Sequence, residues 1–313
     1  MLGYLLRRVL ATIPVMAIVA LFVFSLLYLA PGDPAAVIAG DQASPEDVEK
    51  IRKSLGLDRP FLVRFTEWSL QVLSGDLGIS MFTGLPVTEL IRQRIEPTLS
   101  LMVVTLFLAI GVAVPAGVIA AWKAGTWIDR TVMAFAVLGF SVPVFIIGYL
   151  LAYIFALQLD WLPVQGYTPI SRGFWPWLEN LILPAIALGF VFMALIARIT
   201  RATMLEVLSQ DYVRTARSKG VGEGSILFVH ALKNAAVPIV TVIGIGVALL
   251  IGGAVVTESV FAIPGLGRLT IDAIVRRDYP LIQGIVLMFS FSYVLVNLAV
   301  DLIYTLLDPR IRY

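Results

Sequence analysis

The chain has 313 residues, of which 59% are hydrophobic and 14% charged, and its mean hydropathy is +0.93. This composition excludes an ordinary soluble domain and indicates an integral membrane protein. The absence of cysteine and the presence of one histidine, His230, exclude disulfides, thiolate metal sites and Cys–His catalytic pairs. The balance of 23 basic against 21 acidic residues gives no indication of nucleic-acid binding.

Six runs of sequence lack any charged residue and are long enough to cross a bilayer core about 30 Å thick, at a rise of about 1.5 Å per helical residue. They are residues 9–32, 97–122, 131–159, 180–197, 234–257 and 279–300. We therefore expect an all-α, polytopic membrane protein with six transmembrane helices.

Basic residues are distributed unevenly among the segments that join these runs. Twelve Lys and Arg residues fall on the side of the N-terminus and four on the opposite side. Residues 33–96 are left out of this comparison because long loops cross the membrane irrespective of charge. The positive-inside rule therefore predicts that both termini are cytoplasmic and that the 33–96 loop is extracytoplasmic.

The 33–96 loop contains signals for two short helices. Ser44 is a good N-cap for a helix that begins at Pro45, and residues 60–73 form a second helical stretch with Phe61, Phe65 and Trp68 on one face. We divide the chain into residues 1–32 with the first span, a cap of residues 33–96, and a core of residues 97–313. The cap either only covers the bundle or docks another extracytoplasmic protein.

The 198–233 loop is much longer than the usual connector of about 4 to 8 residues. Its residue pattern predicts a short helix over about 209–220, with Ser209 as the N-cap, Asp211 in the first turn and Gly220 as the C-terminal glycine. A capped helix in such a loop indicates a contact with a cytoplasmic partner. A basic helix lying on anionic lipid is the alternative.

The spans hold no ionisable residue, which argues against an ion-coupled transporter. No G-x-x-x-x-G-K-[ST] sequence is present, so the chain cannot hydrolyse ATP by that device. Small residues and prolines instead suggest a polar path for a solute, or they only pack helices together. The candidate path residues are Ser141, Pro143, Gly148, Thr241, Gly244 and Gly246. A channel or facilitator that acts alone is a rival function, and an intramembrane protease is disfavoured because no catalytic set lies in the spans.

Motifs along nearly the whole chain resemble the first permease subunit of bacterial peptide importers of the ATP-binding-cassette (ABC) class. The family also includes permeases for nickel complexes, glutathione and opines. The matching segments are Arg7-Arg8 and residues 30–34 (APGDP), 55–60 (LGLDRP), 75–78 (GDLG), 198–201 (RITR), 211–220 (DYVRTARSKG), 264–267 (PGLG), 277–280 (RDYP) and 308–312 (DPRIR).

This resemblance implies the MetI-like fold of type I importer permeases, a bacterial inner-membrane location and transport of short peptides or a similar small solute. It implies a non-catalytic subunit that binds no cofactor or metal itself and no nucleic acid. The implied partners are membrane lipid, a homologous second permease, an extracytoplasmic solute-binding protein and two cytoplasmic ATPase subunits that hydrolyse ATP with Mg.

The resemblance also implies that the 209–220 helix is the coupling helix that contacts an ATPase subunit. The family's Glu-Ala-Ala motif is altered here, because Arg214 replaces the glutamate, while the second alanine is kept at Ala216. The coupling residues implied in this way are Asp211, Tyr212, Arg214, Thr215, Ala216, Arg217, Lys219 and Gly220.

Overall fold

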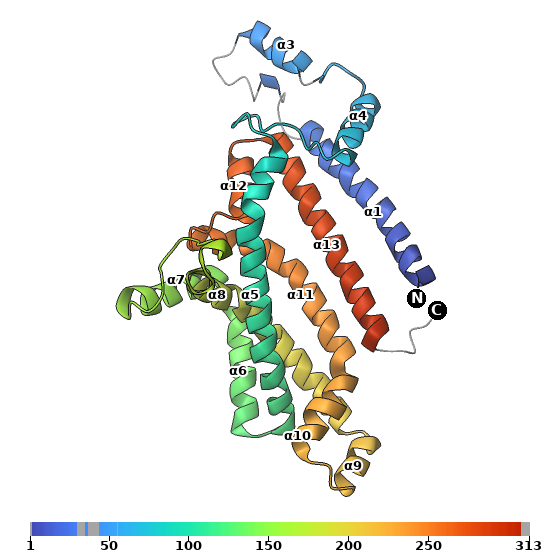
Figure 1. Cartoon of the computed structure of the whole chain (residues 1–313), viewed down its shortest axis with the longest axis vertical. Coiled ribbons are helices and arrows are strands. Elements are labelled where there is room, and N and C mark those ends of the chain that lie inside the picture. The colour runs from blue at the N-terminus through green and yellow to red at the C-terminus, as the bar shows by residue number, and fades with distance from the viewer. Residues whose placement is uncertain (1, 30–34, 37–43, 55, 308–313) are drawn as a thin grey trace. The chain divides into compact units, whose positions relative to one another are not determined.

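Helices make up the regular structure of the described chain, which a computed structural model gives for residues 2–29, 35–36, 44–54 and 56–307. Among these residues there is no β-strand, only one isolated bridge between Ile79 and Pro86. The 30–34 and 308–312 motifs lie outside the described residues. The long helices are α1 (Leu2–Leu29), α5 (Val87–Trp122), α8 (Phe174–Leu208), α11 (Leu232–Val260) and α13 (Tyr279–Leu307), as Figure 1 shows.

Shorter helical elements complete the chain. They are α3 (Pro45–Ser54), α4 (Phe61–Leu73), α6 (Trp127–Ser141), α7 (Val144–Leu151), the π-helical η1 (Ala152–Gln158), the 3-10 turn η2 (Ile170–Arg172), α9 (Asp211–Ser218), α10 (Glu223–Ser225), the π-helical η3 (Ile226–Ala231) and α12 (Leu266–Val275). The expectation of an all-α protein is confirmed.

Within the described residues, five helices are long and apolar enough to cross a membrane, and α6 with α7 and η1 supplies a sixth candidate as a bent pair. The run 131–159, expected as one continuous span, is broken, with a bend of 108° between its halves. The break falls at Val142 and Pro143. Proline supplies no N–H, and it disfavours helical backbone in the residue before it, so Val142 is extended with φ −104° and ψ 124°.

The second span also differs from expectation, because α5 begins at Val87, ten residues before the charge-free run. The extension carries charged side chains that stabilise a helix in water. Arg92 donates to the Glu89 carboxylate at 2.9 Å, a pairing of residues one turn apart. The predicted boundary at residue 96 therefore falls inside a helix.

The contacts divide the chain into two compact units. The first contains Glu96–Arg268 and the part of the chain from Leu295 onward. Its core is built around α8, whose central residues Leu181, Leu188 and Phe192 are buried. Small residues bring helices together here: a Cβ on Gly139 would lie 2.6 Å from the Ala194 Cβ, and α6 therefore packs closely on α8.

The second unit contains Leu2–Ile95 and Leu269–Val294. The predicted cap of α3 is confirmed, because the Asp47 N–H donates to the Ser44 hydroxyl oxygen at 3.3 Å and the Ser44 hydroxyl donates to the Asp47 carboxylate at 2.7 Å. The hydrogen bond from Ser44 and a weaker one from Lys50 hold the pKa of Asp47 below its usual value. The predicted second helix is confirmed as α4.

A buried aspartate orders the loop before α5 in this second unit. Asp278, the acid of the 277–280 motif, accepts hydrogen bonds from the Ser80 hydroxyl and from the Met81 N–H at 3.1 Å. The Arg276 guanidinium lies 3.8 Å from the centre of the exposed Phe82 ring. These contacts hold the 79–86 loop against the turn between α12 and α13.

Candidate functional site

The helix α9 carries most of the predicted coupling residues, between α8 and α11 in the chain (Figure 1). It begins at Asp211, with Gln210 at the N-cap position. The prediction that Ser209 caps this helix is wrong, because Ser209 ends α8, where its hydroxyl donates to the Glu206 carbonyl at 2.7 Å. The acidic residue in the first turn is Asp211, as expected.

The end of α9 requires a glycine. Gly220 has φ +79°, a conformation that residues with a Cβ rarely adopt. This geometry lets the Val221 N–H reach back to the Ala216 carbonyl at 3.2 Å. The prediction that Gly220 is the C-terminal glycine of this helix is confirmed.

One face of α9 is fixed to the rest of its unit. The Val213 side chain is fully buried, and the Asn234 amide donates to the Tyr212 hydroxyl at 2.9 Å. Arg217 donates twice to the Glu223 carboxylate, at 2.8 and 3.3 Å, and these hydrogen bonds raise the pKa of Arg217. Tyr212 and Arg217 thus join α9 to the start of α11 and to α10.

The opposite face of α9 is polar and exposed. The side chains of Asp211 and Arg214 are 94% and 81% exposed and lie 3.6 Å apart as a loose ion pair. Thr215 and Lys219 are also exposed, whereas Ala216 is partly buried. The structure therefore places the predicted coupling residues on one short helix, with anchoring side chains on one face and exposed charges on the other.

A buried ion pair that sequence reasoning missed supports α8 before it reaches α9. Arg201 donates from two nitrogens to the carboxylate of Asp129, one of them at 2.7 Å. Asp129 is buried and also accepts from the Gly125 N–H at 2.9 Å. Arg201 belongs to the 198–201 motif, but the sequence holds no signal that pairs it with Asp129, 72 residues away.

The predicted path residues are dispersed in the structure. Ser141 is exposed at the end of α6, and Pro143 lies at the α6–α7 break. Gly148 lies against Phe261, while a Cβ on Gly244 would lie 2.5 Å from Val300 and one on Gly246 would lie 2.1 Å from Phe192. These three glycines therefore serve close packing between helices.

Thr241 also faces a neighbouring helix. Its hydroxyl donates to the Val237 carbonyl at 2.8 Å and accepts from the Tyr304 hydroxyl at 2.7 Å. Four of the six candidate path residues thus contact other parts of the same chain. A role for Ser141 and Pro143 in a solute path stays a prediction.

The 264–267 motif surrounds a buried carboxylate that lies one residue beyond the charge-free run 234–257. Glu258 is fully buried at the end of α11 and accepts from the Thr98 hydroxyl at 2.6 Å and the Arg268 N–H at 2.9 Å. Thr98 in turn accepts from the Leu266 N–H at 2.8 Å. A Cβ on Gly265 would lie 2.2 Å from the Glu258 Oε1, so only glycine fits there.

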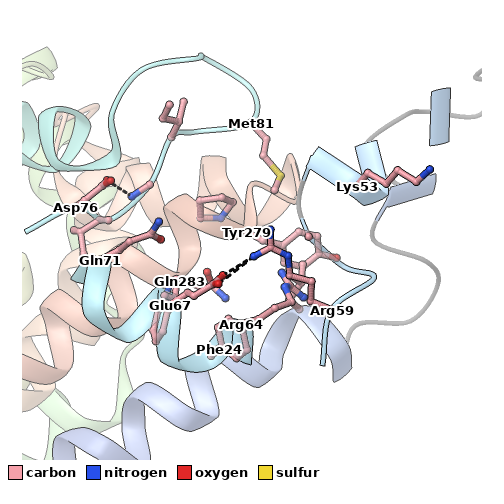
Figure 2. A pocket seen from close by; sticks show the side chains of 17 residues that line it. Phe24, Lys53, Arg59, Arg64, Glu67, Gln71, Asp76, Met81, Tyr279 and Gln283 are labelled. Atoms are coloured by element: carbon pink, nitrogen blue, oxygen red, sulfur yellow. Dashed lines mark hydrogen bonds and ion pairs between the residues drawn. The ribbon is translucent and has the colours of Figure 1, made fainter. Parts of the chain in front are cut away.

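A pocket of about 510 Å³ lies in the second unit beside α4. Figure 2 shows Arg59 and Arg64 on one side and Asp76 with Gln71 on the other. Arg59 is paired with Glu67 through two hydrogen bonds of 3.0 Å. The pocket, which we call the α4 pocket, thus brings cationic, anionic and aromatic groups together in one hollow.

Two family descriptions match the chain. Residues 113–313 match the binding-protein-dependent transport system inner membrane component, and residues 1–102 match the N-terminal region of such a membrane component. The chain is also similar in fold to a chain of the methionine ABC transporter MetNI in an inward-facing conformation. That match has a TM-score of 0.58 at 19% identity and covers 70% of this chain and 96% of the other.

Curated relatives match over the full length. A probable peptide ABC transporter permease of Sinorhizobium fredii is 57% identical, with 99% of both chains covered. The dipeptide transport permease DppB of Alkalihalophilus pseudofirmus is 41% identical and the glutathione transport permease GsiC of Escherichia coli is 42% identical, each with 100% of both chains covered. These findings confirm the predicted family, the MetI-like fold and the inner-membrane location. The chain belongs to the family of binding-protein-dependent transport system inner membrane components.

Proposed function

We propose that this chain is the transmembrane permease subunit of an ABC importer for short peptides. Relatives that match from end to end at 41–57% identity and are named for peptide or dipeptide transport support this assignment. The relative named for glutathione, itself a short peptide, is as similar as the dipeptide permease, so glutathione is the second candidate cargo. Nickel chelates and opines are further alternatives within the same subfamily.

The main support for this proposal is that α9 exposes one charged face, while its other face is held by the buried Val213 and by the hydrogen bonds of Tyr212 and Arg217. In the complex we propose, α9 is the coupling helix and sits against one of two ATPase subunits, which hydrolyse ATP with Mg. The exposed side chains of Asp211 and Arg214 make that contact. The permease chain has no catalytic role in this scheme.

The anchors of α9 give a route for motion from the ATPase into the membrane. Force on α9 passes through Tyr212 to Asn234 at the start of α11, and through Arg217 to Glu223 in α10. The Asp129–Arg201 pair joins the same end of α8 to α6. ATP-driven displacement of α9 would therefore shift several helices together and alternate access to a central path.

The remaining partners follow from the same proposal. A homologous permease pairs with this chain, both termini are cytoplasmic, and the 33–96 region lies outside. There the α4 pocket and the 79–86 loop would receive a solute-binding protein that delivers the cargo. Selection of the cargo then depends mainly on that delivering protein.

Cross-linking tests the proposed contact. Because the chain has no cysteine, Arg214→Cys gives one reactive site on the exposed face of α9. Trp175→Cys is the matched control, since Trp175 is 67% exposed at the far end of α8, a helix about 50 Å long at about 1.5 Å per residue. In the assembled complex a short maleimide–diazirine photo-cross-linker, attached through the cysteine thiol and activated by light, should join Arg214→Cys, and not Trp175→Cys, to an ATPase subunit. Equal cross-linking at both positions, or none at Arg214→Cys, would contradict the assignment.

A further inference from the structure

The helix α4 has three distinct faces. At 3.6 residues per turn, Phe61, Phe65 and Trp68 fall within about 60° of one another. A second face carries Arg64, Glu67 and Gln71, and all three of these side chains line the α4 pocket. The third face carries Leu62, Val63, Leu70 and Leu73, which we call the leucine face.

The aromatic face binds α4 to the C-terminal part of α1. The Phe24 ring lies 5.3 to 5.5 Å from the rings of Phe61, Phe65 and Trp68, and the Tyr28 ring lies 5.2 Å from Phe61. The Arg64 guanidinium lies over the rings of Phe24 and Tyr28 and donates a hydrogen bond to the Tyr28 hydroxyl. Figure 1 shows α4 beside this end of α1.

These contacts fix the depth of α4. The candidate span in α1 runs from Arg7 to Leu29 and is free of charged residues from Val9 onward. Phe24 precedes its end by five residues, about 7.5 Å at about 1.5 Å per residue. A helix held against Phe24 and Tyr28 therefore lies at the boundary between hydrocarbon and water. Helices at that boundary typically bury their apolar face about 5–10 Å into the bilayer surface.

The leucine face is too apolar for water. Among the described residues nothing covers it: Leu62, Leu70 and Leu73 are 73%, 62% and 83% exposed. Thr66 lies between Leu62 and Leu70 on this face, and its hydroxyl donates to the Leu62 carbonyl at 2.8 Å. The polar atom in the middle of the face is thus satisfied within the helix, as entry into hydrocarbon requires.

We propose that α4 is an interfacial helix whose leucine face lies in the lipid at the end of α1. The arginine and glutamate face then points away from the acyl chains and leaves the α4 pocket open to water. The aromatic rings of Phe24, Tyr28 and Trp68 form the anchor at the same level. The pocket is in this way held at the membrane surface, where the proposed solute-binding protein would meet the chain.

Depth-dependent quenching tests this proposal in the assembled complex. Single cysteines at Leu62, Leu70 and Leu73 are labelled with an environment-sensitive nitrobenzoxadiazole dye, and Gln71→Cys on the pocket face of the same helix is the matched control. Each complex is placed in nanodiscs of phosphatidylethanolamine and phosphatidylglycerol, with or without nitroxide on the lipid acyl chains. We expect quenching at the three leucine positions to be at least twice that at Gln71→Cys, and aqueous iodide to show the opposite order.

Two results would overturn the proposal. One is equal lipid quenching at all four positions with full access to iodide, which would leave the leucine face in water. The other is shielding from both lipid nitroxide and iodide, which would mean that a protein subunit covers it. Because all three leucines are exposed, their replacement removes few contacts, and size-exclusion chromatography of each complex checks that assembly is retained.

Discussion

The buried carboxylate of Glu258 accepts a 2.6 Å hydrogen bond from the hydroxyl of Thr98, 160 residues away in the sequence. Together with the Arg268 N–H, this contact closes the 261–267 turn around the end of α11. The space that the carboxylate occupies explains Gly265, since a Cβ there would lie 2.2 Å from the Glu258 Oε1. A Cβ on Gly267 would meet the Val255 backbone first, at 2.5 Å, and Glu258 at 3.0 Å.

The first prediction concerns that turn. Gly265→Ala should destabilise the chain by about 1–3 kcal/mol, because the added methyl group overlaps a carboxylate that cannot move into solvent. Gly252→Ala is the matched control, since its Cβ would meet nothing within 4 Å. Thermal unfolding in detergent measures both variants. A Gly265→Ala chain as stable as the control would show that the 261–267 turn is not closely packed against the Glu258 carboxylate.

A second prediction concerns the backbone conformation of Gly220 at the end of α9. Gly220→Val should cost about 1–2 kcal/mol locally, because a β-branched residue is forced into left-handed backbone. Open space surrounds the Cβ position, so no clash contributes. Gly222→Val is the control, since Gly222 has an ordinary extended backbone with φ −62°. Peptide uptake should fall strongly in Gly220→Val and little in Gly222→Val, with equal membrane insertion. Full uptake by Gly220→Val would count against transmission through α9.

A third prediction concerns the Asp129–Arg201 pair. Asp129→Ala leaves a mostly buried guanidinium without its carboxylate and should destabilise the chain by about 1–3 kcal/mol; the 26% exposure of Arg201 reduces the cost. The double variant Asp129→Ala with Arg201→Met should recover part of that loss. Unfolding midpoints of the two single variants and the double variant form the test. Additive losses would show that the two residues act independently.

The fourth prediction concerns Tyr167, whose hydroxyl donates to the Glu96 carboxylate at 3.0 Å and lies 3.1 Å from the Ser100 hydroxyl. Burial is the main cause that raises the pKa of Tyr167 above its usual value. The folded state therefore favours the protonated phenol. Its stabilising effect is complete below the unfolded pKa of about 10 and is lost as pH rises through the higher folded pKa.

Tyr167→Phe should lower stability by about 1 kcal/mol near neutral pH and should flatten the loss of stability above about pH 10. The measurement is the unfolding temperature in detergent from pH 8 to pH 11. Tyr153→Phe serves as the control, because Tyr153 is exposed. If the two variants have the same alkaline profile as the unmodified chain, the Tyr167 contact does not contribute.

Local signals in the sequence predicted the parts of the structure that depend on neighbours in the chain. Ser44 caps α3, Gly220 ends α9, and Phe61 with Phe65 and Trp68 forms the packed face of α4. Each depends on residues within a few positions of one another. Hydropathy likewise found the apolar spans, because crossing a bilayer demands a long charge-free run.

Contacts between distant residues were not predictable in the same way. The 131–159 run is uniformly apolar, and hydropathy carries no information about the direction of a helix after Pro143. The charged residues at the start of α5 lie outside the charge-free run 97–122, so hydropathy does not show that the helix already begins at Val87. Glu258 and Asp129 fall outside the charge-free runs, and their burial could not be predicted because it depends on Thr98 and Arg201, which only the fold brings near.

The most direct test of the proposed function is ATP-dependent uptake of a labelled dipeptide by proteoliposomes. The vesicles contain this chain with its partner permease, and are compared with and without the ATPase subunits, in the presence of the solute-binding protein. We expect uptake only when the ATPases and ATP are both present, and loss of uptake when α9 carries Asp211→Ala with Arg214→Ala. Equal uptake by vesicles that lack the ATPase subunits would contradict it and would identify a channel or facilitator.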